Sequence, residues 1–341
     1  MTRFIIRRLF ASIFVILAII TITLWITRLA PSNPCLDERD VNACACVHQH
    51  KLDRPVFPVY AGETLAPLSG CQYWEPETGF SAGPVTFVGP TEWGETQYAI
   101  YLKTLASGSL GDSMISDLTV LEILGEALPY SLLLGLQALL IALILGVPAG
   151  LFAGLRQNTA ADYGVMTVAM IGVSIPNFVL GPLLILIFAI HLGWFSAVGW
   201  YSWTDSILPS ITLGLFYVAY VARLTRGGVL EVIRKDYIRT ARAKGLVERL
   251  VVMRHALKGA LLPVVSYLGP AFAALLAGSV VVEEIFNLPG VGTHFVRSAL
   301  NRDYNLVLGT IILYSSLLVF LNMVVDILYT VLDPRVSYDD D

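Results

Sequence analysis

Uncharged stretches of about 17 to 29 residues recur along this 341-residue chain. Each is long enough to cross a hydrocarbon core about 30 Å thick as an α-helix. Only 14% of the residues are charged, whereas roughly 25% is typical of a soluble globular domain. The sequence also lacks the short alternating segments that build a transmembrane β-barrel. We therefore predict an all-α integral membrane protein.

The charge-free intervals predict six transmembrane helices. They lie between Arg8 and Arg28, between Glu126 and Arg156, from Asp162 to about Ile190, between Asp205 and Arg223, between Lys258 and Glu283, and between Asp303 and Asp326. The first could be mistaken for a signal peptide. Its apolar run is too long, however, and Arg28 and Pro31 follow where a cleavage site needs small residues. We interpret it as an uncleaved helix.

The distribution of Lys and Arg predicts the orientation. With the N-terminus inside, the inner segments hold fifteen of these residues and the outer segments seven, and positive residues accumulate on the cytoplasmic side. Both termini are therefore expected to be cytoplasmic. The net charge of −4 divides into +7 inside, −10 outside and −1 from Asp326. This acidic total argues against a polyanionic partner, so we expect no nucleic acid to bind.

This orientation divides the chain into three parts. Residues 1–30 form the N-terminus and first helix, residues 31–125 an extracytoplasmic insertion, and residues 126–341 a transmembrane domain with a cytoplasmic loop at 223–262. The insertion holds all four cysteines, which are Cys35, Cys44, Cys46 and Cys71. Extracytoplasmic cysteines favour disulfides. A bridge between Cys44 and Cys46 would be strained. We therefore expect Cys35 to form a disulfide with one of these two cysteines and Cys71 with the other.

Two alternatives for these cysteines stay open. Cys44 and Cys46 alternate with His48 and His50, and on an extended strand this spacing would aim all four side chains at one side, as in a metal site. Free thiols are the other alternative. We favour disulfides and predict no metal site.

The sequence contains no chemistry for energy conversion or catalysis of its own. It has no Gly-Lys dipeptide, hence no phosphate-binding loop of the Gly-x-x-x-x-Gly-Lys type. The interiors of the spans hold no Asp, Glu, Lys or Arg, which argues against an enzyme and against a proton- or sodium-driven carrier. Asp326, near the inner end of the last span, is interpreted as a hydrogen-bonded residue. If ATP drives this protein, another subunit binds it.

Uncharged polar residues in the spans could line a path for a large polar solute. The candidates are Gln137, Ser174, Asn177, Tyr217, Tyr220, Ser266 and Tyr267. The alternative for each is a residue that serves helix packing or lies at the membrane interface.

The basic loop from Arg223 to Lys258 is the most informative segment. It is predicted to be helical, because apolar residues recur at three- and four-residue spacing; these are Leu246, Leu250, Met253 and Leu257. A patch of small residues precedes a predicted helix break, and it consists of Thr240, Ala241, Ala243 and Gly245. Small side chains allow close approach to another surface, and the adjacent cations can pair with acidic groups there. The alternative is a loop lying on anionic lipid.

The sequence DYIRTARAKG, followed by RHALKGALLP, resembles the cytoplasmic loop of ABC-importer permeases, in the branch that takes up oligopeptides and dipeptides. MTRFIIRRLF, RLAPSNP, LGWFSAVGW, GSVVVEEIFNLPGVG, ALNRDYNLVLG and VDILYTVLDPRVSY resemble other segments of that family, in the same order. Gly245, Ala241 and Leu257 match the generic loop pattern, whereas Arg239 with Thr240 and Lys258 depart from it as the peptide branch does. In the segment from Cys35 to about Glu95, the cysteines and tryptophans match no motif of the family that can be carried over.

The resemblance implies a six-helix permease of the type I ABC-importer fold in a bacterial inner membrane. It implies four kinds of partner: a second, homologous permease, two cytoplasmic ATPase subunits that bind ATP and Mg, an extracytoplasmic peptide-binding protein, and membrane lipid. The loop would form a coupling helix against an ATPase subunit through Arg239, Thr240, Ala241, Arg242, Ala243, Lys244 and Gly245. The turn that contains Glu283, Glu284 and Asn287 would face the binding protein, the alternative being a solvated loop.

Other functions remain open. The same architecture also serves the uptake of nickel and glutathione, and no motif in this sequence reads the ligand. A membrane scaffold or an intramembrane enzyme is the alternative outside this class.

Overall fold

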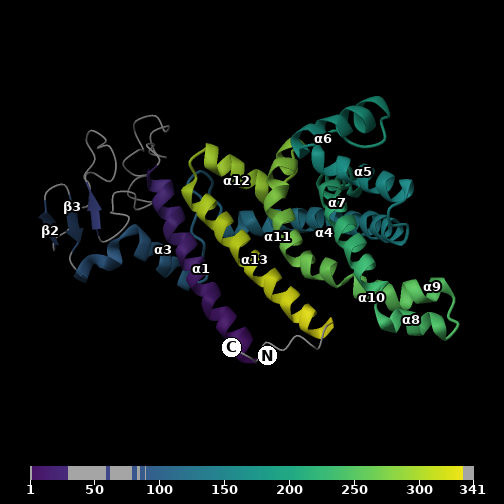
Figure 1. Cartoon of the computed structure of the whole chain (residues 1–341). Coiled ribbons are helices and arrows are strands. Elements are labelled where there is room, and N and C mark those ends of the chain that lie inside the picture. Colours follow the sequence, from purple (N-terminus) through teal and green to yellow (C-terminus); the bar gives the residue numbers. More distant parts are fainter. Residues whose placement is uncertain (1, 30–58, 62–78, 83–84, 89, 333–341) are drawn as a thin grey trace. The chain divides into compact units, whose positions relative to one another are not determined.

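The computed structural model describes residues 2–29, 59–61, 79–82, 85–88 and 90–332 (Figure 1). The four cysteines, together with His48 and His50, lie outside these ranges. The disulfide pairing and its metal-site alternative therefore stay predictions, as does the insertion as a whole.

Helices dominate the described residues. They are α1 (Thr2–Leu29), α3 (Gln97–Ala106), α4 (Val120–Leu155), α5 (Ala160–Ser174), α6 (Asn177–Leu184), α7 (Ile207–Val232), α8 (Asp236–Ala243), α9 (Glu248–Leu250), α10 (Leu257–Ala260), α11 (Leu262–Ile285), α12 (Val291–Leu300) and α13 (Tyr304–Leu332). Two π-helical segments, Ile185–His191 and Val251–Ala256, continue α6 and α9, and 3-10 helices cover Pro90–Glu95 and Trp203–Ser206.

Each of the six predicted spans coincides with a helix or a bent helix pair. Among the described residues, α4, α7 with its preceding turn, and α13 as far as Val324 are long and apolar enough to cross a membrane. Two bent pairs supply the third and fifth spans, and the apolar part of α1, Phe10–Ile26, corresponds to the first.

The third span is not the single helix that the sequence predicted. α5 ends at Ser174, and a second helical segment, Asn177–His191, starts after a bend of 99°. Pro176 has no backbone N–H to donate, and its ring disfavours helical geometry for the residue before it. Ile175 accordingly has extended torsions, with φ −97° and ψ 117°.

The fourth span was predicted to end at Arg223, but its helix continues into the predicted cytoplasmic loop. α7 continues nine residues past Arg223 to Val232. A Cβ atom at Gly228 would clash with the backbone carbonyl of Ala260, so the missing side chain lets α7 pack directly against α10. α11 likewise runs to Ile285 and includes Glu283, and α13 continues beyond Asp326 to Leu332.

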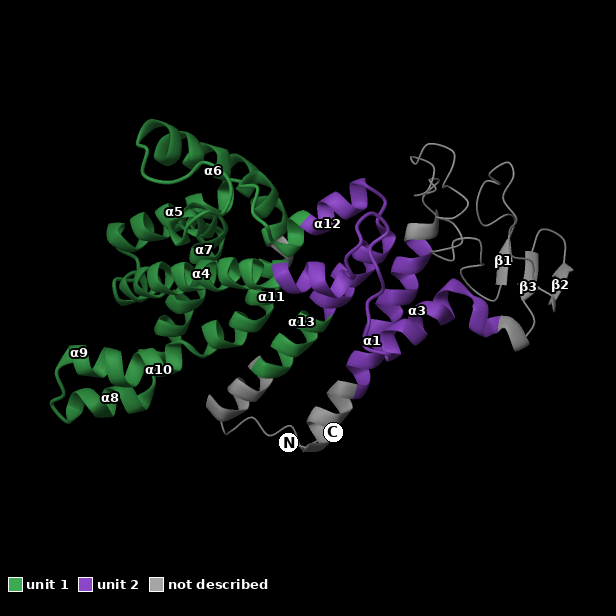
Figure 2. Cartoon of the chain, turned by 180° about the vertical axis from the view of Figure 1, so that it is seen from behind, with its two compact units in different colours: residues 1–9, 127–293, 316–341 green, residues 10–126, 294–315 purple. Residues whose placement is uncertain are grey.

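The chain divides into two compact units (Figure 2). Unit 1 comprises residues 1–9, 127–293 and 316–341, and unit 2 comprises residues 10–126 and 294–315. Unit 2 contains a three-stranded antiparallel sheet of β1 (Val59–Ala61), β2 (Gly79–Ala82) and β3 (Val85–Val88), in the order β1-β3-β2. Phe87 pairs with Val59 on one side and with Phe80 on the other. Nothing in the sequence analysis predicted these strands.

Helical residues of unit 2 share a small apolar core. Ile20 and Leu24 of α1 pack with Tyr101, Leu308 and Ile312. The buried Asp303 carboxylate accepts hydrogen bonds from the Ser113 hydroxyl and from the backbone N–H groups of Met114 and Leu306. This carboxylate therefore ties the segment before α4 to the start of α13.

α7 is the central helix of unit 1, and α4 packs against it through three glycines. Gly146, Gly150 and Gly154 are four residues apart and so lie on one face of α4. A Cβ atom at Gly146 or Gly154 would lie 2.8–2.9 Å from Val221 or Val229 of α7, and one at Gly150 would clash with the backbone of α7. Small residues at this spacing let membrane helices approach closely, since no hydrophobic effect drives them together in lipid.

Candidate functional site

The coupling hairpin, defined here as residues 236–256, begins with α8 and turns at Gly245. Gly245 has φ +75°, and its N–H donates to the Arg242 carbonyl at 2.9 Å. Glycine adopts such left-handed torsions without the strain that a Cβ atom causes, and it commonly ends helices in this way. The helix break predicted at the small-residue patch therefore lies at Gly245.

One face of α8 is buried within the protein. Ile238 and Ala241, three residues apart, are 0% and 6% exposed and belong to a small apolar cluster. The other members of that cluster are Val232, Val251 and Ala256. Ala241 was predicted to be a docking residue, and its burial corrects this, because its methyl group secures the hairpin instead. The other six predicted coupling residues are exposed: Arg239, Thr240, Arg242, Ala243, Lys244 and Gly245.

Ion pairs close the hairpin. The Arg242 guanidinium donates to both carboxylate oxygens of Glu248, at 3.0 and 2.6 Å. This hydrogen bonding raises the pKa of Arg242 above its ordinary value. Arg239 pairs more loosely with Asp236, at 3.5 Å. Arg242 thus links the end of α8 to the start of α9.

The hairpin also exposes apolar side chains. Val247 is 63% exposed and Met253 54%, and Tyr237, Leu246 and Leu250 are exposed as well. Three of these residues, Leu246, Leu250 and Met253, form the periodic apolar pattern that the sequence analysis singled out. Five exposed apolar side chains within one short hairpin that also carries charges are typical of a protein contact.

Aromatic residues among the pathway candidates gather on α7 and α11. Tyr220 and Tyr267 stack with ring centroids 6.0 Å apart, and Phe216 contacts both Tyr217 and Tyr220 at 5.3 Å. Tyr217 is buried, whereas Tyr220 and Tyr267 are half-buried. The structure therefore brings together three of the seven predicted pathway residues.

The remaining pathway candidates do not form one group with them. Ser174 and Ser266 are exposed, and their hydroxyls donate to carbonyls of their own helices. Asn177 is half-buried in the first turn of α6. Gln137 of α4 accepts a hydrogen bond of 2.7 Å from Ser210 of α7, which makes it a helix-packing residue.

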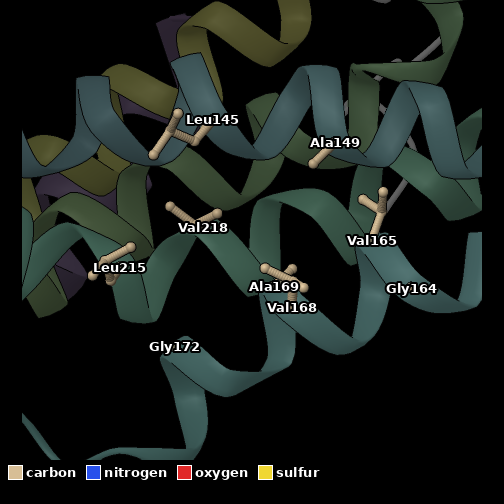
Figure 3. Close-up of a pocket in the computed structure, with 9 residues that line it drawn as sticks. All are labelled: Leu145, Ala149, Gly164, Val165, Val168, Ala169, Gly172, Leu215 and Val218. Carbon is tan, nitrogen blue, oxygen red and sulfur yellow. The ribbon is translucent and has the colours of Figure 1, made fainter. Parts of the chain in front are cut away.

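An apolar cavity of about 380 Å³ lies between α4, α5 and α7 (Figure 3). Its lining consists of Leu145, Ala149, Gly164, Val165, Val168, Ala169, Gly172, Leu215 and Val218. None of these side chains can form a hydrogen bond. A peptide backbone needs such partners when it leaves water, so the cavity is unsuited to a peptide.

Glu283 is buried rather than exposed at a surface turn, which corrects its prediction as a binding-protein contact. Its side chain is 1% exposed. One carboxylate oxygen accepts from the hydroxyls of Ser131 and Ser279, at 2.8 and 2.6 Å. The other accepts from the N–H groups of Gly292 and Thr293, at 2.7 and 3.3 Å, at the start of α12. Glu284 and Asn287 are exposed, and so they remain candidates for a surface contact.

An ion pair that the sequence analysis did not single out joins α5 to α7, with a buried carboxylate and a guanidinium that is 26% exposed. Arg226 donates from Nε and Nη2 to the two oxygens of Asp162, each at 2.7 Å. Asp162 is 1% exposed and also accepts from the N–H of Asn158. The signal that could have indicated it is the spacing of Thr159 and Asp162, which is typical of a helix start.

A family model described as the inner membrane component of binding-protein-dependent transport systems matches residues 146–338. This range contains the coupling hairpin, the tyrosines of α7 and α11, and Glu283. The chain belongs to this family.

Curated relatives extend the similarity to the whole chain. The oligopeptide transport system permease protein OppB of Salmonella typhimurium is 42% identical over 341 residues, covering 99% of this chain and all of the relative. The dipeptide transport system permease protein DppB of Bacillus subtilis is 37% identical over 99% of this chain and 98% of the relative. The glutathione transport system permease protein GsiC of Escherichia coli is 41% identical over 71% of this chain and 79% of the relative.

A solved structure with a similar fold is a chain of the inward-facing MetNI methionine ABC transporter. The TM-score is 0.52 at 18% identity, and the match covers 62% of this chain and 97% of that chain. At this identity the match concerns the fold alone. The predicted fold class, a helical permease of the ABC-importer type, is confirmed.

Proposed function

We propose that this chain is the transmembrane permease of an ATP-driven importer of peptides. In this proposal the coupling hairpin docks on an ATPase subunit and passes its conformational change to the transmembrane helices. The observation that carries the proposal is the shape and surface of this hairpin. α8 and α9 project beyond the other helices of unit 1 (Figure 1). Ile238 and Ala241 anchor the hairpin from inside, while Arg239, Lys244 and Val247 face outward. An element that is anchored from inside and has an exposed apolar and basic surface is suited to docking.

The partners follow from this role. Two cytoplasmic ATPase subunits bind ATP and Mg, a second homologous permease completes the pathway, and an extracytoplasmic binding protein delivers the peptide. Glu284 and Asn287 are the residues of this chain that we assign to the binding-protein side. In this arrangement the chain lies in a bacterial inner membrane with both termini in the cytoplasm, in agreement with the excess of Lys and Arg in the inner segments.

The pathway runs along α7 and α11. Tyr220 and Tyr267 are half-buried on these helices, whereas Tyr217 belongs to the buried core, and Ser174 and Ser266 add exposed hydroxyls on α5 and α11. Hydroxyls can exchange hydrogen bonds with a peptide backbone whatever its side chains are. Relatives named for oligopeptide and dipeptide transport match this chain nearly from end to end, which supports a peptide as the substrate.

The coupling role is tested with Gly245→Trp in the complete complex, reconstituted with its binding protein. No atom lies within 4 Å of a Cβ atom at Gly245, so the indole would project into the space that a docked subunit needs. We expect the ATPase subunits to be lost on purification and peptide uptake to be abolished, while membrane insertion continues.

Gly108→Trp is the matched control. Gly108 also has a positive φ, +82°, and also faces open space, but it follows α3 in the segment predicted to be extracytoplasmic. It imposes the same backbone strain away from the hairpin, so the ATPase subunits should remain bound. Uptake that survives Gly245→Trp would refute the coupling role, and so would equal loss of the ATPase subunits in both variants.

A further inference from the structure

Arg223 is an exposed cation on the pathway face of α7. It belongs to a stripe of residues at helical spacing, which are Phe216, Tyr220, Arg223, Gly227 and Glu231. Its guanidinium lies over the ring of Tyr220, 5.9 Å from the centroid, and Nη2 donates to the thioether sulfur of Met170 at 3.0 Å. Tyr220 in turn stacks on Tyr267. Arg223 thus contacts α5 and lies next to the aromatic group that α7 shares with α11.

This guanidinium has hydrogen-bonding capacity to spare. A thioether is a weak acceptor, and an aromatic ring occupies only one face of the guanidinium, which carries five N–H donors. None of the carboxylates in the described residues forms an ion pair with Arg223. Glu231, on the same stripe, pairs with Lys235 at 2.8 Å. Arg226, one turn away, differs in that both oxygens of Asp162 engage it.

The composition of the stripe distinguishes it from a lipid-facing surface. The exposed residues of α4 include Leu136, Leu140, Ile144 and Leu145, and such aliphatic side chains suit contact with acyl chains. The stripe on α7 instead presents tyrosine, arginine, glycine and glutamate beside a single phenylalanine, with exposed serines on α5 and α11. Polar side chains in membrane spans normally face the bundle interior or a water-filled cavity, and Arg223 follows the tyrosines at the predicted cytoplasmic end of this span. The stripe therefore suits a polar solute rather than lipid tails.

We propose that Arg223 binds the C-terminal carboxylate of the peptide during its passage, a proposal that rests on the proposed function. The planar fork of an arginine matches a carboxylate in a bidentate pair. A carboxylate at the C-terminus is common to all unmodified linear peptides, whatever their sequence. One cation at this position would therefore recognise a peptide without selecting its side chains, and the tyrosines beside it would contact the adjoining backbone.

The test compares two peptides of one sequence, one with a free C-terminal carboxylate and one with a C-terminal amide. The complete complex is reconstituted in vesicles, and loading of the binding protein with each peptide is measured separately and made equal. The wild-type complex should import the free acid faster than the amide. In Arg223→Gln the import of the acid should fall about tenfold, the loss expected for a hydrogen bond to a charged group, while import of the amide stays unchanged.

Arg156→Gln is the matched control. Arg156 is also exposed and also lies over an aromatic ring, that of Phe152, at 4.5 Å from the centroid. It is not on the stripe, so its substitution should leave the preference for the acid intact. Arg223→Lys retains the charge without the planar fork and should retain part of the preference. This variant keeps the proposal testable if Arg223→Gln does not assemble.

Vesicles with and without anionic lipid distinguish whether Arg223 binds the carboxylate of the peptide or the headgroup of a lipid. A fall in import that is equal for acid and amide, and that vanishes without anionic lipid, would assign Arg223 to lipid and overturn the proposal. Equal import of acid and amide by the wild type would overturn it too, while leaving peptide import itself established. Import of neither peptide would overturn the proposed function and this inference with it.

Discussion

Replacing Glu283 by alanine tests whether its carboxylate secures the junction of α11, α12 and α4. The carboxylate accepts four hydrogen bonds in a site that is almost completely buried. Two come from hydroxyls, of Ser131 and Ser279, and two from backbone N–H groups of Gly292 and Thr293. Bulk water does not reach this site to replace the four hydrogen bonds, so the substitution should lower the free energy of unfolding strongly.

The expected magnitude follows from these four donors. In Glu283→Ala the two hydroxyls can rotate toward other acceptors, as Ser279 already reaches the Leu276 carbonyl at 2.7 Å. The two N–H groups cannot rotate, and each buried unsatisfied donor costs about 1–3 kcal/mol. We expect the free energy of unfolding to fall by about 4 kcal/mol.

Glu283→Gln separates hydrogen bonding from charge. A glutamine of the same shape can accept from Gly292 and Thr293 through its oxygen and donate to the two serine hydroxyls through its NH₂ group. The two hydroxyls then accept instead of donating, and Ser279 can direct its own proton to the Leu276 carbonyl. The attraction between the carboxylate and the N-terminus of α12 is also lost. This attraction contributes about 0.3–1 kcal/mol, so the loss should be about 1 kcal/mol.

The assay is unfolding of the purified protein in mild detergent by titration with a denaturing detergent, followed by loss of helical circular dichroism. Glu284→Ala is the control, because the neighbouring side chain is exposed and surface substitutions usually change stability by no more than about 0.5 kcal/mol. If Glu283→Ala and Glu284→Ala shift the midpoint of the unfolding transition equally, the carboxylate of Glu283 does not secure the junction of α11, α12 and α4. A glutamine variant as unstable as the alanine variant would show that charge, rather than hydrogen bonding, dominates.

Two further predictions concern the packing around α7, with the same unfolding measurement. Gly150→Leu should prevent folding in detergent, because even its Cβ atom would clash with the Ala222 carbonyl. Gly164→Ala is the control: its Cβ atom meets open space, so the free energy of unfolding should change by no more than about 1 kcal/mol. Similar behaviour of both variants would contradict the close contact between α4 and α7. Asp162→Asn should cost about 1–3 kcal/mol, because it removes the charged partner of the Arg226 guanidinium, which is 26% exposed and so can be partly solvated. Adding Arg226→Gln should recover part of that loss, and no recovery would contradict an ion-pair origin.

Properties carried by single segments could be predicted from the sequence. The six spans follow from the length of charge-free intervals, since the cost of placing a charge in hydrocarbon is a property of each residue. The helix break at Gly245 was likewise indicated by a local pattern. The spacing of Leu246 and Met253 indicated a helix, but not that these side chains are exposed. The resemblance of the coupling loop to a family of permeases rested on contiguous motifs, and the comparisons confirm it.

Only the tertiary structure decided which residues meet. Glu283 looked like a surface residue because it follows an uncharged stretch, yet its partner Ser131 lies 152 residues away in the sequence. Gln137 was a candidate for the pathway, but because α4 packs on α7 its side-chain oxygen accepts a hydrogen bond from Ser210. Hydropathy and spacing describe how each segment interacts with lipid and water, and this determines where the helices are. The pairing of polar groups inside the protein depends on close approach between distant segments, and the glycines of α4 and the bend at Pro176 control that approach.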